Sequence, residues 1–333
     1  MVPRPRASVS ETRNHHYVPQ GYLRGFAVYP PAYPKKAKLL TIDLTQGRSF
    51  TVSVRNIAAI RDFNRIDAEG HDPNALENAY AGFESMAASA IKRVAKSGAF
   101  EGDDKILVLN LIALMATRNP RLRKNWSDFT NRLYRIVLET SFATEDRYNK
   151  LRKRMEAEMP HAKPLAQLPY EGFREFIKSD RYEFETHQNT LIRLELDVFE
   201  SVLKTLFARK WVLQIANDQA GDFVTSDHPV VLTSLRQSDP GVGHGLKETM
   251  LLFPLTRKCA LMGTFEGDEG VIQAPTTLVA LANSAVIARA TARVYAYNDS
   301  FRYVKRDQMC AGKDLHCDPD CRLRSIDEDE GEK

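Results

Sequence analysis

The chain has 333 residues, of which 43% are hydrophobic and 27% are charged, a composition that excludes disorder of the whole chain. No apolar run approaches the roughly 18 residues that a membrane-spanning helix needs, and the arginine-containing start lacks the apolar stretch of a secretory signal. Four cysteines, three of them near the end, do not form a disulfide framework. These features predict a soluble cytoplasmic protein with no membrane partner.

Positive charge is concentrated in one part of the chain. The formal net charge is only +4, but eleven basic and four acidic residues lie between Arg118 and Arg154. A basic face attracts polyanions, although a solvated helix surface is the commoner origin of such a pattern. A nucleic-acid partner is therefore one expectation for a basic helix over 118–154.

The first 60 residues are predicted to form a flexible arm followed by extended segments. Residues 1–13 are expected to form a flexible arm. The segment 14–27, rich in histidine and aromatic residues, is expected to end in a short helix with Pro19 in its first turn. Two β-forming runs, 38–44 and 49–54, are separated by Thr-Gln-Gly-Arg and predict a hairpin.

The middle of the chain, 72–209, is predicted to be helical. Asp72 and Pro73 are a good N-cap and first residue for a helix whose apolar residues recur at spacings of three and four. A second helix, 105–119, is apolar nearly all round and should be central in the core. The basic helix follows, and another helix is expected over about 184–209.

From residue 211 onward the pattern changes to short apolar runs typical of strands. Five such runs lie within 211–263, and a helix over 275–292 precedes a last strand at 294–297. The predicted fold class is α+β, with a long helical segment between the N-terminal hairpin and the C-terminal strands of a mixed or antiparallel sheet. A single domain over 14–303 would then be followed by a cysteine-containing, acidic tail over 304–333.

The adjacent histidines His15 and His16 form the most unusual polar cluster. Side chains of neighbouring residues on an extended segment point in different directions, so at most one of them reaches a given metal or substrate. An imidazole acts as base, donor or ligand near neutral pH. The alternative is a histidine that only fixes the N-terminal segment by hydrogen bonds.

Several charged residues lie on elements that are otherwise apolar. Glu77 and Glu84 are seven residues apart on the first long helix, and Arg118 ends the second. A buried carboxylate is costly unless it meets an arginine, a histidine or a metal, so a structural Glu–Arg pair is one reading. Asp227 lies between two β runs, where it could act as a ligand or base, or form a turn that satisfies backbone amides. Together with His16, these are the residue types of a divalent-cation site.

The C-terminal cysteines offer a second possible metal site. Cys310, His316, Cys317 and Cys321 are all potential zinc ligands, but the spacing Cys-x6-Cys-x3-Cys matches none of the usual zinc patterns. Free thiols in a loose tail are the other interpretation. Cys259, within an apolar run, is expected in the core.

The segment from His16 to Phe26, His-Tyr-Val-Pro-Gln-Gly-Tyr-Leu-Arg-Gly-Phe, resembles the opening signature of the bacterial domain of unknown function 4238 family. Later landmarks fit the family in the same order, and the resemblance spans roughly residues 14–298. These landmarks are Glu77 and Glu84, the Arg118-Asn-Pro-Arg run, the Phe223-Val-Thr-Ser-Asp-His-Pro-Val run, Phe253–Thr256, and Asn283 before Val294-Tyr-Ala-Tyr. The resemblance implies a fold and shared polar positions rather than a reaction.

Two functions compete at this stage. The first is a metal-dependent hydrolase or nuclease acting on phosphodiesters, in which His16 is the general base or a ligand, Glu84 and Asp227 hold a divalent metal ion as cofactor, and Arg118 clamps phosphate. We expect His16, Glu84 and Asp227 to line one pocket with Arg118 at its rim. Glu84 is preferred over Glu77, which is near the solvated start of its helix.

The second function is a non-catalytic nucleic-acid or protein-binding module that uses the basic helix 118–154. In that case the polar cluster only stabilises the fold. No Gly-x-Ser-x-Gly elbow, glycine-rich phosphate loop or His-Glu-x-x-His helix points to another class of enzyme.

Overall fold

A computed structural model describes most of the chain, namely residues 13–29, 36–158, 169–179, 181–236 and 242–318. The chain divides into two compact units: the first comprises residues up to 119 and from 194 onward, and the second comprises 120–193. The fold is α+β, as predicted, with mixed and antiparallel sheets. The range 14–303, for which a single domain was predicted, contains the whole of the second unit.

The larger sheet of the first unit has the strand order β10-β5-β9-β8-β7. It is mixed, because β10 is parallel to β5 while the other neighbours are antiparallel. The edge strand β10 is mostly exposed and was not among the predicted strands. The strands are β5 (Lys210–Ala216), β7 (Val231–Ser234), β8 (Thr249–Thr256), β9 (Cys259–Thr264) and β10 (Gly270–Ala274).

The smaller sheet is antiparallel and has the order β3-β2-β11-β6. The predicted hairpin forms its β2–β3 pair, and β11 adds beside β2. The hairpin and the C-terminal strands were expected in one sheet, but only β6 and β11 join the hairpin, and the other C-terminal strands form the larger sheet. Its strands are β2 (Lys38–Asp43), β3 (Arg48–Ser53), β6 (Thr225–Ser226) and β11 (Arg293–Ala296).

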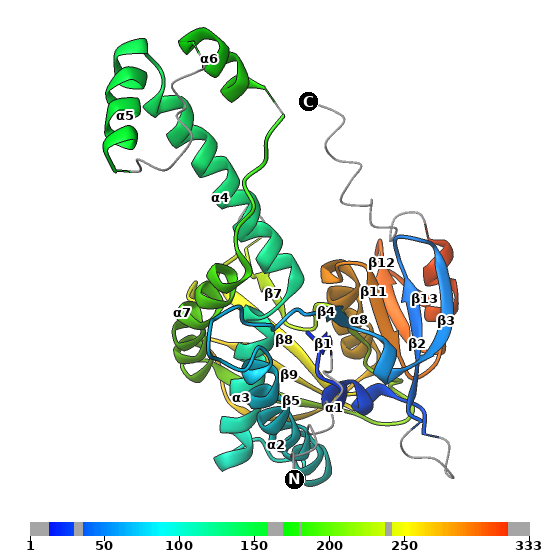
Figure 1. Cartoon of the computed structure of the whole chain (residues 1–333). Helices are drawn as coiled ribbons and strands as arrows, with labels where there is room; N and C mark the ends of the chain where they lie inside the picture. Colours follow the sequence, from blue (N-terminus) through cyan, green and yellow to red (C-terminus); the bar gives the residue numbers. More distant parts are fainter. Residues whose placement is uncertain (1–12, 30–35, 159–168, 180, 237–241, 319–333) are drawn as a thin grey trace, which may run out of the picture. The chain divides into compact units, whose positions relative to one another are not determined.

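Helices cover both faces of the larger sheet. Figure 1 shows α2 (Ala75–Ser97) and α3 (Gly102–Thr117) beside β5, β8 and β9. Side chains of β8 alternate: Phe253 packs into the core with these helices, and Leu252 into the core around α8 (Thr276–Arg289). The uniformly apolar α3 is central, since residues 111–115 are all buried. This confirms the prediction for the second helix.

Two local features set the position of α2. It begins at Ala75 rather than at Asp72, because the Asp72 carboxylate accepts the Asn74 N–H at 2.9 Å and organises the turn before the helix. The helix ends at Gly98, whose φ of 70° is the left-handed conformation that glycine adopts without strain.

The N-terminal signature segment packs directly on α2. It forms β1 (Asn14–His16), α1 (Gln20–Leu23) and the short helix η1 (Arg24–Phe26). A Cβ added at Gly21 would lie 2.8 Å from the Cβ of Ala88, so glycine permits this close approach. β1 pairs with β4 (Ala59–Arg61), a pairing that was not predicted from the sequence, and η2 (Val54–Asn56) leads from β3 toward β4.

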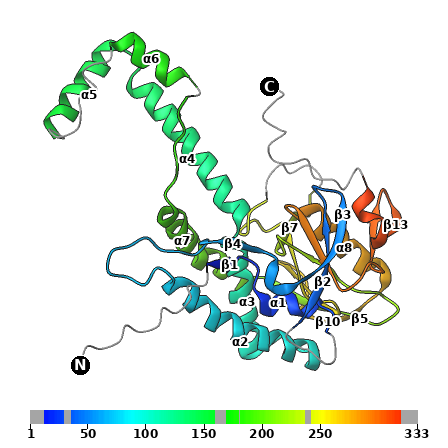
Figure 2. The same ribbon diagram turned by 45° about the vertical axis from the view of Figure 1, so that its right-hand side comes forward.

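The second unit contains α4 (Pro120–Ser141), α5 (Glu145–Glu158) and α6 (Tyr170–Lys178), which Figure 2 shows gathered at one end of α4. Its small core consists of Tyr148, Phe173 and Ile177, with Phe142 packed against it. The expected single basic helix over 118–154 is therefore wrong: the chain breaks near Phe142, whose ring turns into this core. The helix α6 was not predicted, and α7 (Gln188–Phe207) corresponds to the helix expected over 184–209.

The C-terminal region is more ordered than expected. Residues after 303 were predicted to be a loose tail, but β12 (Arg302–Lys305) pairs with β13 (Gln308–Ala311), and η4 (Gly312–Cys317) follows. The acidic end with Cys321, like nearly all of the predicted arm, lies outside the described residues. Within the described ranges, no helix has the length and apolar character needed to cross a membrane.

Candidate functional site

A polar cluster forms where α2 passes the end of α3. Glu77, Tyr80 and Glu84 occupy positions i, i+3 and i+7 of α2 and therefore share one face of that helix. Arg118 directly follows the last residue of α3, with its backbone N–H still bonded to the carbonyl of Leu114. The end of α3 thereby directs a cation toward the carboxylates of α2.

Arg118 is the most unusual residue of this cluster. Its side chain is only 1% exposed, its Nη2 donates to Glu84 Oε1 at 2.6 Å, and its Cζ lies 4.3 Å from the centre of the Tyr80 ring. The other two nitrogens, Nε and Nη1, are buried without a hydrogen-bond partner within the described part of the chain. Unpaired buried donors are costly, and these two N–H groups are the hydrogen-bonding capacity of Arg118 that Glu84 does not use.

Glu84 holds the guanidinium in place. Its side chain is 17% exposed. Burial raises the pKa of Glu84, and the charge and hydrogen bond of Arg118 oppose that shift. The structural Glu–Arg pair considered from the sequence is therefore present, and Glu84 is its carboxylate. Glu84 was expected instead to face His16 and Asp227.

His16 lies on the partly buried edge of the cluster. Its Nε2 is 3.2 Å from the carbonyl oxygen of Arg55, so this nitrogen carries the hydrogen, and Nδ1 is 3.5 Å from the Gln20 amide nitrogen. Burial lowers the pKa of His16, and the charge of Arg118 acts in the same direction, whereas the Arg55 carbonyl and Glu77 oppose it. The imidazole is therefore neutral at pH 7, and the lone pair on Nδ1 accepts the long hydrogen bond from the Gln20 amide.

His15 has a different role from its neighbour. It is fully buried, and its Nδ1 accepts the backbone N–H of Asn64 at 2.9 Å. The Asn64 amide in turn donates to Glu77 Oε2 at 2.6 Å. Because His15 Nδ1 is an acceptor, its 4.0 Å approach to Glu77 Oε2 is not an ion pair. His15 thus fixes the N-terminal segment, while His16 faces the cluster.

Asp227 is part of the framework rather than of this cluster. One carboxylate oxygen accepts the Thr291 N–H at 2.8 Å, and the other accepts the N–H groups of Ala292 at 2.7 Å and Arg293 at 2.9 Å. Burial raises the pKa of Asp227 to about 6, against the effect of these three amides. The carboxylate stabilises the turn between α8 and β11. This is the structural role, acceptance of backbone amides, that was one of the alternatives from the sequence.

The predicted metal set of His16, Glu84 and Asp227 is not assembled. Among the residues with described positions, no three His, Cys, Asp or Glu side chains gather as ligands for a metal ion. Glu84 is paired with Arg118, and both oxygens of Asp227 accept backbone amides. The structure brings together Glu84 and Arg118 and places His16 within electrostatic reach of Arg118.

Two members of the cluster were missed from the sequence. Tyr80 was counted as part of an apolar stripe, although its spacing from Glu77 and Glu84 would have placed it on their face of the helix. Asn64 carried no signal, because its contact with His15 depends on the pairing of β1 with β4.

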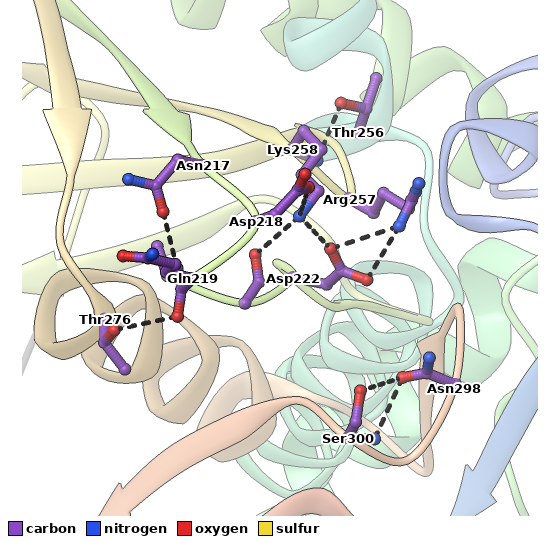
Figure 3. Close-up of polar contacts among 12 residues, drawn as sticks. Asn217, Asp218, Gln219, Asp222, Thr256, Arg257, Lys258, Thr276, Asn298 and Ser300 are labelled. Carbon is purple, nitrogen blue, oxygen red and sulfur yellow. Dashed lines mark hydrogen bonds and ion pairs between the residues drawn. The ribbon is translucent and has the colours of Figure 1, made fainter.

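Figure 3 shows a second charged cluster, in which the turn between β8 and β9 meets the loop after β5. Lys258 Nζ lies 2.9 Å from an Asp222 oxygen and 3.2 Å from an Asp218 oxygen. Arg257 also pairs with Asp222, at 3.2 Å, and its Cζ lies 4.2 Å from the centre of the Tyr297 ring. Two cations are paired with two carboxylates here, so their charges compensate one another. The cluster joins two loops, and its charges do not call for a bound ion.

Other landmarks of the sequence make structural hydrogen bonds. The Tyr22 hydroxyl donates to the carbonyl of Pro254 and contacts the Thr225 hydroxyl, both at 2.7 Å. The Asn283 side chain accepts the Val224 N–H at 2.9 Å and donates to the carbonyl of Arg302 at 2.8 Å. Tyr22 therefore links β6 to β8, and Asn283 links α8 to the start of β12.

Fold and cluster together define an α+β protein with a buried arginine–glutamate pair beside a neutral histidine. The model of the family DUF4238, described as a protein of unknown function, matches residues 14–300. The chain belongs to this family, as the N-terminal signature indicated. No curated protein and no solved structure gives a significant match. The family description specifies no reaction, so function is argued from the cluster.

Proposed function

We propose that the chain is a hydrolase acting on phosphodiesters, with His16, Glu84 and Arg118 as its site. One observation carries the proposal: the buried Arg118 has two unpaired nitrogens and lies within electrostatic reach of a neutral histidine. A desolvated guanidinium with free donors suits an anionic group, and phosphate and guanidinium form strong charge-assisted hydrogen bonds.

Arg118 binds a non-bridging oxygen of the phosphodiester through Nη1 or Nε. Glu84 is a positioning residue, because its bond to Nη2 and the Tyr80 ring fix the plane of the guanidinium. The negative charge on the phosphoryl oxygens is stabilised there without reorganisation of solvent, since the cation is already desolvated and oriented.

His16 supplies the proton transfer. A water molecule loses a proton to Nδ1 as its oxygen bonds to phosphorus, and the bond to the leaving oxygen breaks. The imidazolium then returns the proton to that oxygen. The Arg55 carbonyl, which accepts the hydrogen of Nε2, fixes the tautomer and stabilises the imidazolium. The divalent ion expected from the sequence is not part of this scheme, because Glu84 and Asp227 are committed to other partners.

The test is a screen of the purified chain against bis-p-nitrophenyl phosphate, single-stranded RNA and single-stranded DNA, with His16→Ala as the variant. We expect His16→Ala to lose about 10²–10⁴-fold in rate at an unchanged melting temperature. His71→Ala is the matched control, because His71 is an exposed histidine in the loop before α2. Hydrolysis of none of the three substrates, or equal rates for both variants, would overturn the proposal.

The second candidate is the non-catalytic binding module, and one observation favours a protein as its partner. Helix α4 exposes an apolar stripe formed by Phe129, Leu133, Ile136 and Val137. Several of the basic side chains of α4 and α5 are in ion pairs within their own helix, among them Lys150 with Asp146 at 2.8 Å. Binding of labelled RNA or DNA that weakens steeply with salt would instead support the nucleic-acid form of this candidate.

A further inference from the structure

The apolar stripe of α4 lies opposite the face that this helix turns toward its own unit. Leu138 packs against the small core of the second unit. It follows Phe129 by nine residues, which is about two and a half turns of helix, so the two side chains point to opposite sides. The stripe is 45–61% exposed and consists of Phe129, Leu133, Ile136 and Val137. None of the four belongs to the described core of this unit.

The spacing of the stripe is that of a seam between two helices. Phe129, Leu133 and Ile136 are separated by four and three residues, and Thr140 continues the pattern four residues later. An apolar repeat of this kind keeps one line of side chains facing a partner helix. Large apolar side chains that are contiguous on an exposed face, rather than scattered singly, mark an interaction site.

One edge of the stripe carries both a cation and an anion. Arg132 directly precedes Leu133, Glu139 directly precedes Thr140, and both charged side chains are exposed. They are seven residues apart and therefore lie on one line along the helix. Among the residues with described positions, neither has an ion-pair partner, and Arg132 makes only a 3.4 Å hydrogen bond to the Asp128 carbonyl of its own helix.

These charges match those of a second α4 helix only when the two run antiparallel. With Leu133 opposite Ile136 of the second copy, Arg132 of each chain lies beside Glu139 of the other. Because a twofold axis repeats every contact, the pairing forms two ion pairs. A parallel pair would instead bring Arg132 beside Val137 and match no opposite charges.

We propose that the apolar stripe of α4 is the contact surface of a homodimer in which two α4 helices pack antiparallel. The partner is a second copy because a single helix carries both charges at the positions that a twofold axis requires. A patch on one helix is at the small end of specific interfaces, so the dimer is reversible, with a micromolar dissociation constant. The proposal specifies the protein partner of the second candidate function. It does not depend on the proposed hydrolysis, since none of these residues belongs to the His16 cluster.

The test measures the mass of the full chain by sedimentation equilibrium, from low micromolar to several hundred micromolar protein. We expect a monomer–dimer equilibrium. Ile136→Glu should weaken association by about 30-fold or more, because it buries a carboxylate in the seam. Its circular dichroism and melting temperature should match those of the parent chain, since Ile136 is 60% exposed in the monomer. Leu281→Glu is the matched control, because Leu281 is a 54% exposed leucine of α8, and it should associate like the parent.

Two charge reversals test the antiparallel register. Arg132→Glu and Glu139→Arg each bring like charges together in a homodimer, so each should weaken association several-fold. An equimolar mixture of the two variants should associate again, because position 132 of one chain then faces the opposite charge at position 139 of the other.

Three results would overturn the proposal. The parent chain could be monomeric at every concentration, which would assign the stripe to a different partner. Ile136→Glu could associate as tightly as Leu281→Glu, which would place the dimer contact elsewhere. The mixture of charge-reversed variants could associate no better than either variant alone, which would exclude the antiparallel pairing.

Discussion

At the scale of single residues, the stability of the cluster depends on the ion pair of Arg118 with Glu84, whose charges are largely removed from water. Removing the partner of a buried ion leaves an uncompensated charge, which costs more than the pair itself is worth. We therefore expect Glu84→Ala to lower the free energy of unfolding by about 3–5 kcal/mol, measured by urea denaturation. Glu200→Ala, which removes an 80% exposed glutamate of α7, should change it little. Equal effects of the two variants would mean that Arg118 is not held by Glu84.

The pH dependence of the proposed reaction follows from His16. Its pKa is lowered by burial, so the base form persists to a lower pH than in a free histidine. We expect kcat/KM to fall as the pH drops through this lowered pKa, with an acid limb below about pH 6.5. An acid limb above that value would contradict the assignment of His16 as the base.

Folding stability should respond to His16 with the corresponding sign. Between the lowered pKa of His16 in the folded state and its ordinary pKa in the unfolded state, the folded protein binds fewer protons than the unfolded chain. The free energy of unfolding therefore increases as the pH rises through this range. His16→Ala should remove that increase, whereas His71→Ala should leave it in place.

Asp227 gives a stability prediction that is unrelated to catalysis. Above about pH 6 its carboxylate is ionised and accepts three backbone N–H groups. An asparagine replaces one oxygen by a donor and leaves amides unpaired. We expect Asp227→Asn to cost about 1–3 kcal/mol of unfolding free energy at pH 7. If Asp227→Asn lost activity but kept its stability, Asp227 would belong to the catalytic site rather than to the framework.

At the scale of elements, the close contact of α1 with α2 positions the signature segment. Gly21→Ala should destabilise the protein by about 1–3 kcal/mol, because the new methyl group meets Ala88. The second variant, Ala88→Gly, makes room at a helix-propensity cost of about 1 kcal/mol. The double variant should be more stable than the sum of the two single effects, and strict additivity would show that the helices do not touch there.

At the scale of the whole molecule, the two units differ in the size of their cores. The described core of the second unit has three buried side chains, whereas α3 lies inside an extensive core of the first. Amides with few buried contacts around them exchange through smaller openings. We expect hydrogen exchange of α5 and α6 to be much faster than that of α3 at pH 7. Equal protection would indicate that both units unfold as one.

Local patterns in the sequence determined most of the elements and the fold class. The alternating runs of β2 and β3 and the apolar stripes of α2 and α3 required a sheet and helices that bury them, whatever their neighbours were. A Glu–Arg pair was also among the readings, because a carboxylate on a buried helix needs a counter-charge, but Glu84 was expected to face His16 and Asp227 rather than Arg118.

Only the tertiary structure decided which polar residues meet. The pairing of β1 with β4 buries His15 and leaves His16 at the cluster, and the turn after α8 takes both oxygens of Asp227. The ring of Phe142 turns into the small core of the second unit, where the basic segment breaks into two helices. These outcomes depend on contacts between residues far apart in the chain, and such contacts leave no periodic trace in the sequence that a local pattern could reveal.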